Sequence, residues 1–477
     1  MTARGGQRWF RSSGLTGRQR GVLIAAGAAN ALIFLDQTAV TVALPAIQHD
    51  FDSSTAAVQW TIGAYLLSLA SLMAVSGRLA DFYGRRRLFL AGVSLFGLAS
   101  LACAAAPTDL ALIGARLVQG VGAALTQPLA LAHATAIMPP ERRGWAIGVL
   151  ASAGTTCLMV GPLVGGLLAE TVGWRWVFMV NLPVVALALA LGRRFMPESR
   201  EPDAPALDVP GLLLLTTGLA TIVAGLLHMY EWPFPLVAGM LALGGLALGA
   251  FVAVEGRTVH PLLPLRLLER RAVAGSMAAL FTIQGAVLGV TVYVALFLQN
   301  GLGLSPTAAG AVLLSAMVWS MLLSTRTGEL ADRHGPRRLV GIGLIVAAAG
   351  LAMIGLLAPA EEPLLLVPGL VVFGVSRPFV FTPASTGPLK AIPADERGLA
   401  SSLVTESRQI GAVLGVAVLG SIAAAFDGSG GPGSSAAGLA AGMLVAAAAA
   451  LVSALAALAL LPGAREAAAR SDTGLPA

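Results

Sequence analysis

A few charged side chains stand inside long apolar stretches of this 477-residue chain, where an ionisable group has chemical consequences. Asp36 is one of them, and it lies roughly 15 Å before Pro45 if the segment is helical. A carboxyl group in such surroundings is a candidate proton carrier or a counter-ion for a cationic substrate. The alternative is a structural acid that hydrogen-bonds to Asn30, Gln37 or Thr38.

Arg116 is a second charge inside an apolar stretch, and Gln119 follows it by almost one helical turn. Placing an arginine in hydrocarbon costs about 2.5–3.5 kcal/mol even on lenient insertion scales, so its side chain must face protein or water and find a partner. Gln119 can share that polar face. The alternative is a packing arginine bonded to backbone carbonyls.

Glu406 and Arg408, with Gln409, form a third polar cluster inside an apolar stretch. Residues two apart on a helix point in different directions, so these two charges need not pair with each other. An additional acid favours a cationic substrate or a second proton site. The alternative is a salt bridge between Glu406 and Arg377, which is another charge within an apolar stretch.

The composition indicates that a membrane surrounds these residues. Hydrophobic residues make up 56% of the chain and charged residues only 11%, with a mean hydropathy of +0.82, whereas soluble domains carry about 25% charged residues. A span of about 20 apolar residues crosses the hydrocarbon core. We therefore predict an all-α polytopic membrane protein with about fourteen transmembrane helices. The two cysteines, Cys103 and Cys157, lie in apolar runs and predict neither a disulfide framework nor a metal site.

The basic residues alternate along the predicted loops. Starting from the N-terminus, every second loop holds at least two of them, and the intervening loops hold almost none, with Arg175 the exception. Cytoplasmic loops carry the excess of basic residues, so this pattern supports the number of spans and predicts that both termini are cytoplasmic. The net charge of +6 is then a sign of orientation and not of a nucleic-acid partner.

Two charged loops repeat each other. Residues 77–87 read GRLADFYGRRR and residues 328–338 read GELADRHGPRR, so that Asp81 corresponds to Asp332 at an offset of 332 − 81 = 251. A duplicated membrane module predicts two pseudo-symmetric six-helix bundles, between which alternating access becomes possible. Two predicted helices have no counterpart and form an inserted hairpin.

The chain is accordingly divided into a cytoplasmic N-terminal segment (1–20), an N-terminal six-helix bundle (21–193), a cytoplasmic linker (194–208), an inserted helical hairpin (209–254), a second cytoplasmic linker (255–271), a C-terminal six-helix bundle (272–462) and a cytoplasmic tail (463–477).

Five stretches, in order and in the expected places, resemble signatures of the major facilitator superfamily and, within it, of the fourteen-helix drug:proton antiporters. They are residues 35–45 in helix 1, 77–87 in the helix 2–3 loop, 116–124 in helix 4, 161–166 in helix 5 and 174–183 at the start of helix 6.

The resemblance implies roles for three groups of residues. Proton coupling or substrate binding falls to Asp36, Arg116, Gln119, Glu406 and Arg408. A cytoplasmic latch between the halves comprises Gly77, Asp81, Gly84, Arg85, Arg86, Asp332 and Arg333; the alternative is that the basic residues only orient the protein. Conformational switching falls to Gly161, Pro162, Gly165 and Gly166; the alternative is ordinary small-residue packing. Phe82 departs from the family, which usually has a basic residue there, so the first copy of the latch is expected to be the weaker one.

We therefore expect a proton-coupled antiporter that exports lipophilic drugs or antibiotics, cationic ones included, by alternating access. The proton gradient is the energy source and no cofactor is expected. Its partners are protons, the small-molecule substrate and the lipid bilayer, and we expect a monomer in a bacterial inner (plasma) membrane. An enzyme is not expected, because the chain has no P-loop lysine motif and its histidines lack metal-ligand spacing. The alternatives are an exporter of a native metabolite (a lipid, an amino acid or a self-made antibiotic) and, more distantly, a membrane sensor or scaffold that transports nothing.

Overall fold

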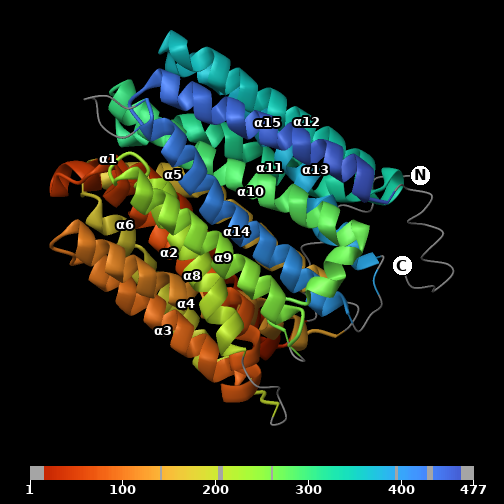
Figure 1. Ribbon diagram of the computed structural model, residues 1–477. Coiled ribbons are helices and arrows are strands. Elements are labelled where there is room, and N and C mark those ends of the chain that lie inside the picture. Colours follow the sequence, from red (N-terminus) through yellow and green to blue (C-terminus); the bar gives the residue numbers. More distant parts are fainter. Residues whose placement is uncertain are drawn as a thin grey trace, which may run out of the picture.

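The structure is a computed structural model, and it describes residues 15–139, 142–201, 208–258, 261–390, 392, 396–426 and 433–462. Long helices run side by side along one axis of an elongated bundle (Figure 1). Thirteen of them are long and apolar enough to cross a membrane, and a further helix contributes the apolar stretch Pro306–Ser320. The predicted fold class, all-α with about fourteen spans, is confirmed.

The first half is built from six spans. They are α1 (Gly17–Phe51), α2 (Thr55–Tyr83), α3 (Arg85–Ala104), α4 (Asp109–Ala136), α5 (Arg143–Thr171) and the pair α6 (Arg175–Met179) and α7 (Asn181–Phe195). The hairpin α8 (Val209–Leu227) and α9 (Phe234–Glu255) follows, with α8 against α2 and α14.

The second half repeats the packing of the first. Its helices are α10 (Arg271–Leu296), α11 (Pro306–His334), α12 (Pro336–Leu357), α13 (Pro363–Lys390), α14 (Arg397–Ala424) and α15 (Ala436–Leu460), with the short helices η2 (Leu265–Glu269), η3 (Phe297–Gly301) and η4 (Ala358–Ala360) beside them. Helix α10 packs against α14 as α1 does against α5, and α13 packs against α11 and α12 as α4 does against α2 and α3.

The repeated loops share a backbone feature. Gly84 ends α2 and precedes α3, and Gly335 does the same between α11 and α12. Their φ angles are +103° and +79°, a region that favours glycine because it has no side chain. The two glycines of the sequence repeat therefore make the same turn in each half.

The span predicted over 176–193 is not one continuous helix. It is interrupted at Val180, between α6 and α7. Pro183 has no N–H with which to bond the carbonyl four residues earlier, that of Met179, and α6 ends at that residue. Asn181, the first residue after the interruption, has a buried side chain.

The two ends of the bundle differ. We call the end where α1 begins and α2 ends the arginine-rich end, and the other the opposite end. At the opposite end the halves are hydrogen-bonded to each other. Gln299 Nε2 donates to the Val42 carbonyl at 3.0 Å, and the backbone N–H of Thr307 donates to Glu170 Oε2 at 3.1 Å. The opposite end is therefore closed between the halves.

Candidate functional site

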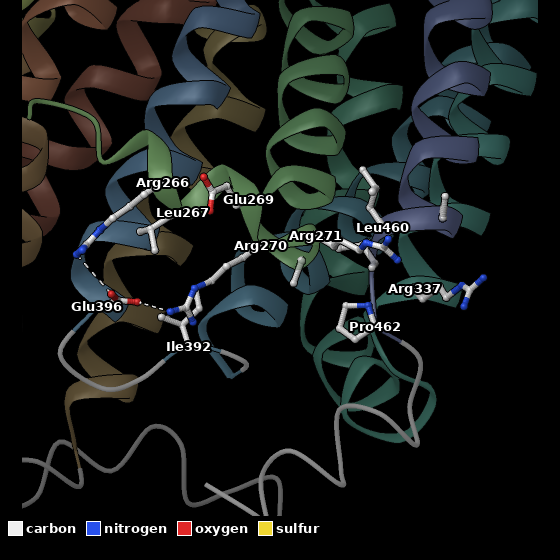
Figure 2. Close-up of a pocket in the computed structure, with 13 residues that line it drawn as sticks. Arg266, Leu267, Glu269, Arg270, Arg271, Arg337, Ile392, Glu396, Leu460 and Pro462 are labelled. Carbon is white, nitrogen blue, oxygen red and sulfur yellow. Dashed lines mark hydrogen bonds and ion pairs between the residues drawn. The ribbon is translucent and has the colours of Figure 1, made fainter. Parts of the chain in front are cut away.

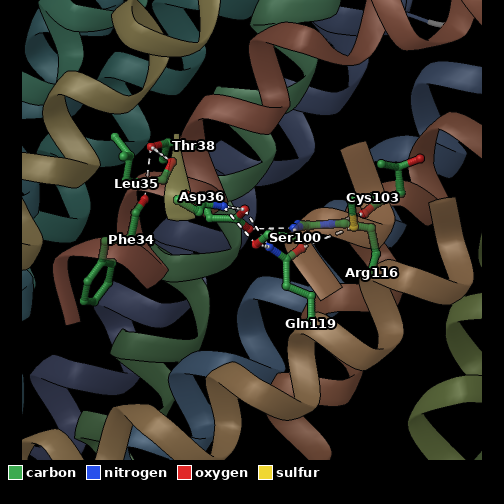
Figure 3. Close-up of polar contacts among 10 residues, drawn as sticks. Phe34, Leu35, Asp36, Thr38, Ser100, Cys103, Arg116 and Gln119 are labelled. Carbon is green, nitrogen blue, oxygen red and sulfur yellow. Dashed lines mark hydrogen bonds and ion pairs between the residues drawn. The ribbon is translucent and has the colours of Figure 1, made fainter. Parts of the chain in front are cut away.

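Asp36 lies at the centre of a buried hydrogen-bond network in the first half (Figure 3). Its Oδ2 accepts a charge-assisted hydrogen bond from Arg116 Nη1 at 2.6 Å. Its Oδ1 accepts from Gln119 Nε2 at 3.1 Å and from Asn181 Nδ2 at 3.0 Å. The Asp36 side chain is 0% exposed and that of Arg116 only 1%, so the ion pair is sealed from water by α1, α4 and α7.

Arg116 has further contacts that hold it in place. Its Nε donates to the carbonyl of Thr61 at 3.0 Å, and Nη1 also donates to Gln119 Oε1 at 2.6 Å. Its guanidinium lies 4.2 Å from the centroid of the Tyr65 ring. Arg116 thus bonds both a carboxylate and a backbone carbonyl, and its role in proton coupling stays a prediction. Such contacts are needed because a buried ion pair is stable only when its remaining donors and acceptors are satisfied.

The network contains residues that sequence reasoning did not assign to a site. Gln119 Nε2 donates to Ser100 Oγ at 2.8 Å, and Cys103 Sγ lies 3.7 Å from Gln119 Oε1. Asn181 belongs to the motif at 174–183. Its polar amide within an apolar span was the sequence signal that could have identified it as a site residue. Two of the partners expected for a purely structural Asp36 bond elsewhere, since Asn30 donates to the carbonyl of Leu150 and Thr38 to that of Phe34.

Helix α5 links this network to the second half through its glycines. A methyl group added at Gly161 would overlap the hydroxyl of Thr38, and one at Gly165 would overlap the backbone of Ala39, both on α1. On the neighbouring face of α5, a methyl group at Gly166 would overlap the backbone of Pro306 on α11. Pro162 lies at the same interface, where its carbonyl approaches Gly310 of α11. Two of the four predicted switching residues thus face α1, and two face the other half.

The second half has its own buried charged residues, but the described ones are not paired with one another as Asp36 is with Arg116. Glu406 is 2% exposed and Arg377 3% exposed. Among the described ion pairs and hydrogen bonds, none joins Glu406 to Arg377, and none joins either residue to Arg408. Arg377 Nη1 instead lies 2.8 Å from the sulfur of Met317. Buried polar atoms without a hydrogen-bond partner in the described part of the chain include Glu406 Oε1, Arg377 Nε and Arg408 Nε.

The amide of Gln409, in the same cluster, reaches across to the first half. Its Nε2 lies 3.5 Å from Oε1 of Gln127 on α4, and both side chains are buried. The Glu406 cluster therefore borders the surface where the halves meet.

The first of the repeated loops contacts its own half and both linkers, and Arg78 donates to the backbone carbonyl of Pro261 in the second linker. Asp81 pairs with Arg85 at 2.9 Å, and Arg86 donates to the backbone carbonyl of Arg193. A side chain at Gly84 would overlap the carboxylate of Glu198, whereas one at Gly77 would meet nothing within 4 Å. The side chains of Asp332 and Arg333 lie outside the described residues, so the latch between the halves stays a prediction.

Comparisons with known proteins point to one family. Residues 26–416 and 275–473 match the sequence model of the Major Facilitator Superfamily. The puromycin resistance protein pur8 of Streptomyces alboniger is 38% identical over 405 residues, which cover 83% of this chain and 80% of that one. The multidrug resistance protein Stp of Mycobacterium tuberculosis is 36% identical over 410 residues, covering 85% and 76%. The crystal structure of a D-xylose-proton symporter matches with a TM-score of 0.67 over 94% of this chain and 99% of that one, and at 15% identity this likeness concerns the fold alone.

Proposed function

The chain belongs to the major facilitator superfamily, as a multi-pass membrane transporter of a drug-efflux family, and we propose that it exports lipophilic drugs or antibiotics in exchange for protons. The observation that carries the proton coupling is the buried pair of Asp36 and Arg116. The drug class rests on the resistance proteins to which the chain is similar. The proton gradient is the energy source, no cofactor takes part, and one chain suffices for transport.

We place the arginine-rich end, with both termini, on the cytoplasmic side of a bacterial inner membrane. Arg18 and Arg20 precede the first apolar stretch, and Arg85, Arg86 and Arg87 follow the second helix at the same end. Basic residues remain on the cytoplasmic side during insertion. The closed opposite end then faces outward, so this structure has its outer side shut.

Protonation of Asp36 is the proposed coupling event. A proton on Asp36 removes the negative charge that holds Arg116 at 2.6 Å, and Arg116 keeps its bond to the Thr61 carbonyl and its contact with Tyr65. The pair therefore has one arrangement for the charged acid and another for the neutral acid. Moving one proton through 100 mV releases about 2.3 kcal/mol, which is enough to bias two arrangements of comparable energy.

The glycine face of α5 carries this change to the other half. Gly161 and Gly165 fit closely against α1, so a displacement of the Asp36 segment moves α5 as well. Gly166 on α5 is in close contact with α11 at the end where the halves are closed. Displacing α5 consequently disturbs the closure, and protonation becomes coupled to opening on the outer side. Close-packed interfaces switch between discrete arrangements and do not deform continuously.

The substrate is proposed to meet Glu406. One carboxylate oxygen of this residue is buried without a partner, and a cationic group on a lipophilic molecule would satisfy it. Its neighbour Gln409 contacts the first half, so a molecule bound there would touch both halves. This placement suits alternating access, in which a site between the halves is exposed to each side in turn.

The two resistance proteins differ in how their names describe the substrate, which gives a second candidate function. One is named for puromycin alone and the other for multiple drugs. A chain similar to both could export a single native compound by the same mechanism. Competition by a panel of unrelated drugs against one transported compound separates the two functions, because only a multidrug exporter is inhibited by most of the panel.

The decisive experiment measures transport of a cationic dye in proteoliposomes with and without an imposed pH gradient. We expect gradient-driven transport by the wild type and its loss in Asp36→Asn. The matched control is Asp50→Asn, because Asp50 also pairs with an arginine, Arg175, at 2.8 Å, but at a surface where both side chains are 44% exposed. Dye transport that ignores the pH gradient would refute proton antiport, and the absence of any transport by the wild type would favour a sensor or scaffold.

A further inference from the structure

A second site is present at the arginine-rich end, away from both buried charge clusters. It is a cavity of about 770 Å³ between the short helix η2, the beginnings of α10 and α12, and the end of α15 (Figure 2). Its charged lining consists of Arg266, Arg270, Arg271, Arg337, Glu269 and Glu396. Four arginines against two glutamates leave a net charge of +2, so the cavity is suited to an anion.

The arginines form two groups with different surroundings. Arg270 and Arg266 both point toward Glu396, at 2.8 and 3.4 Å (Figure 2), so that this acid is shared between two cations. Nη1 of Arg270 is nevertheless buried without a hydrogen-bond partner.

On the other side of the cavity, Arg271 and Arg337 are exposed, and among the described residues no ion pair includes either of them. In Figure 2 Glu269 lies well apart from both. The positive charge that the described residues leave unpaired is therefore concentrated beside the end of α15.

The wall of the cavity next to these two arginines is apolar. It is formed by Leu460, Leu461 and Pro462, with which α15 comes to an end. Arg271 is the first residue of α10, and Pro336, next to Arg337, is the first of α12. The cavity thus lies at the ends of spanning helices, where basic side chains can meet lipid headgroups and the half-buried Leu460 can meet acyl chains.

We propose that this cavity binds an anionic phospholipid of the surrounding bilayer, with the lipid phosphate between Arg271 and Arg337 and its glycerol and first acyl carbons against Leu460. Basic pockets between spanning helices are suited to acidic headgroups. A planar guanidinium can donate two parallel hydrogen bonds to phosphate oxygens. The apolar wall distinguishes a lipid from free phosphate, for which leucine side chains provide no binding energy.

The test is lipid binding to the purified full-length protein, measured by native mass spectrometry with phosphatidylglycerol, cardiolipin and phosphatidylcholine of matched acyl chains. The two anionic lipids should bind and phosphatidylcholine should not. Arg271→Gln with Arg337→Gln should weaken binding by roughly 25-fold, about fivefold for each arginine. The matched control is Arg142→Gln with Arg143→Gln, two exposed arginines at the same end, which should leave the affinity unchanged.

A variant of opposite sign guards against a loss of binding through misfolding. Glu396→Gln removes the acid that neutralises Arg266 and Arg270, so it should strengthen binding of the anionic lipids. Equal binding of phosphatidylcholine, or an unchanged affinity in the Arg271/Arg337 double variant, would overturn the proposal. Equal competition by inorganic phosphate and by phosphatidylglycerol would assign the cavity to free phosphate and would likewise overturn it.

Discussion

The two halves of the protein share one helix packing but hold their buried charges in opposite ways. In the first half both oxygens of Asp36 accept hydrogen bonds, and Arg116 is held by a carboxylate, an amide and a backbone carbonyl. In the second half a carboxylate oxygen of Glu406 and the Nε atoms of Arg377 and Arg408 are buried without partners. The charged groups of the first half are thus paired, and in that network the unpartnered atom is an amide oxygen, Asn181 Oδ1, whereas in the second half the charged groups themselves lack partners among the described residues.

The difference also concerns which helix carries the acid. Asp36 is on α1, which fits against the glycines of α5, and α10 fits in the same way against Gly411 and Gly415 of α14. The acid of the second half, Glu406, is on α14 and not on α10. Duplication has thus preserved the close contact of paired helices while the charges have diverged. A paired acid and arginine are suited to switching by a proton, and charged groups without partners are suited to binding a ligand.

The largest effect should come from breaking the ion pair of Asp36 and Arg116. Asp36→Asn or Arg116→Gln leaves one buried group without its opposite charge, and each should lower the free energy of unfolding by about 3–5 kcal/mol. The double variant should be more stable than the sum of the two losses predicts, since no uncompensated charge remains. Thermal unfolding of the purified proteins measures all three. Strictly additive losses would show that the two side chains do not act as a pair.

A smaller effect on stability, with a selective effect on transport, is expected from Glu406→Gln. No hydrogen-bond or ion-pair partner of Glu406 is lost among the described residues, so the free energy of unfolding should change by no more than about 1 kcal/mol. Efflux of cationic compounds should fall at least tenfold, and efflux of neutral compounds should persist. Glu362→Gln, at an exposed loop position, is the control. Equal losses for neutral and cationic compounds would remove Glu406 from substrate recognition.

Much of this comparison could be predicted from the sequence. The apolar stretches and the alternating arginines predicted the number of spans, and a charged residue in hydrocarbon is costly enough that Asp36 and Arg116 had to be buried with partners. The identity of the partners could not be derived, because the two residues are separated by 80 positions and helical periodicity relates only neighbours. Asn181 was missed since a lone amide in an apolar span is also common in ordinary helix packing.

The helix interruption at Val180 and the two faces of α5 show a second limit. Pro183 weakens the helix on its N-terminal side, but whether a proline kinks a helix or ends it depends on how neighbouring helices satisfy the freed carbonyl. Gly165 and Gly166 are adjacent in the sequence, and only the packing reveals that one faces its own half and the other the second half.

The contrast between those two glycines gives a third prediction. In Gly165→Ala the added methyl group overlaps the Ala39 backbone within one half, so the free energy of unfolding should fall by about 1–3 kcal/mol. In Gly166→Ala the overlap is with Pro306 of the other half, and the halves can separate to relieve it. This variant should keep most of its stability but favour an open outer side. Gly148→Ala, where nothing lies within 4 Å, is the control on the same helix.

Opening can be followed with a cysteine introduced by Gln48→Cys near the closed end, in a background with Cys103→Ala and Cys157→Ala. Its reaction with a membrane-impermeant maleimide should be faster in Gly166→Ala than in Gly165→Ala or Gly148→Ala. Equal rates in the Gly165 and Gly166 variants would mean that the α5–α11 contact does not control closure.

The smallest effect on stability is expected at the loop between α2 and α3. Asp81 and Arg85 form a partly exposed pair four residues apart, a type of pair that contributes about 0.3–0.5 kcal/mol, so Asp81→Asn should unfold at nearly the wild-type temperature.

If the loop only orients the protein in the membrane, the initial rate of proton-driven efflux should be unchanged as well. We expect the rate to fall severalfold, because a latch to the second half would form in another state of the cycle, whereas the described bonds of Asp81 and Arg85 join them to each other and to the linker at Ser199 and Glu201. Arg87 lies in the same loop and has a longer contact, 3.7 Å, with Glu198. Arg87→Gln should therefore leave the efflux rate near that of the wild type. A slow Asp81 variant with normal stability would therefore mark a transport-specific role that the static contacts of the loop do not reveal.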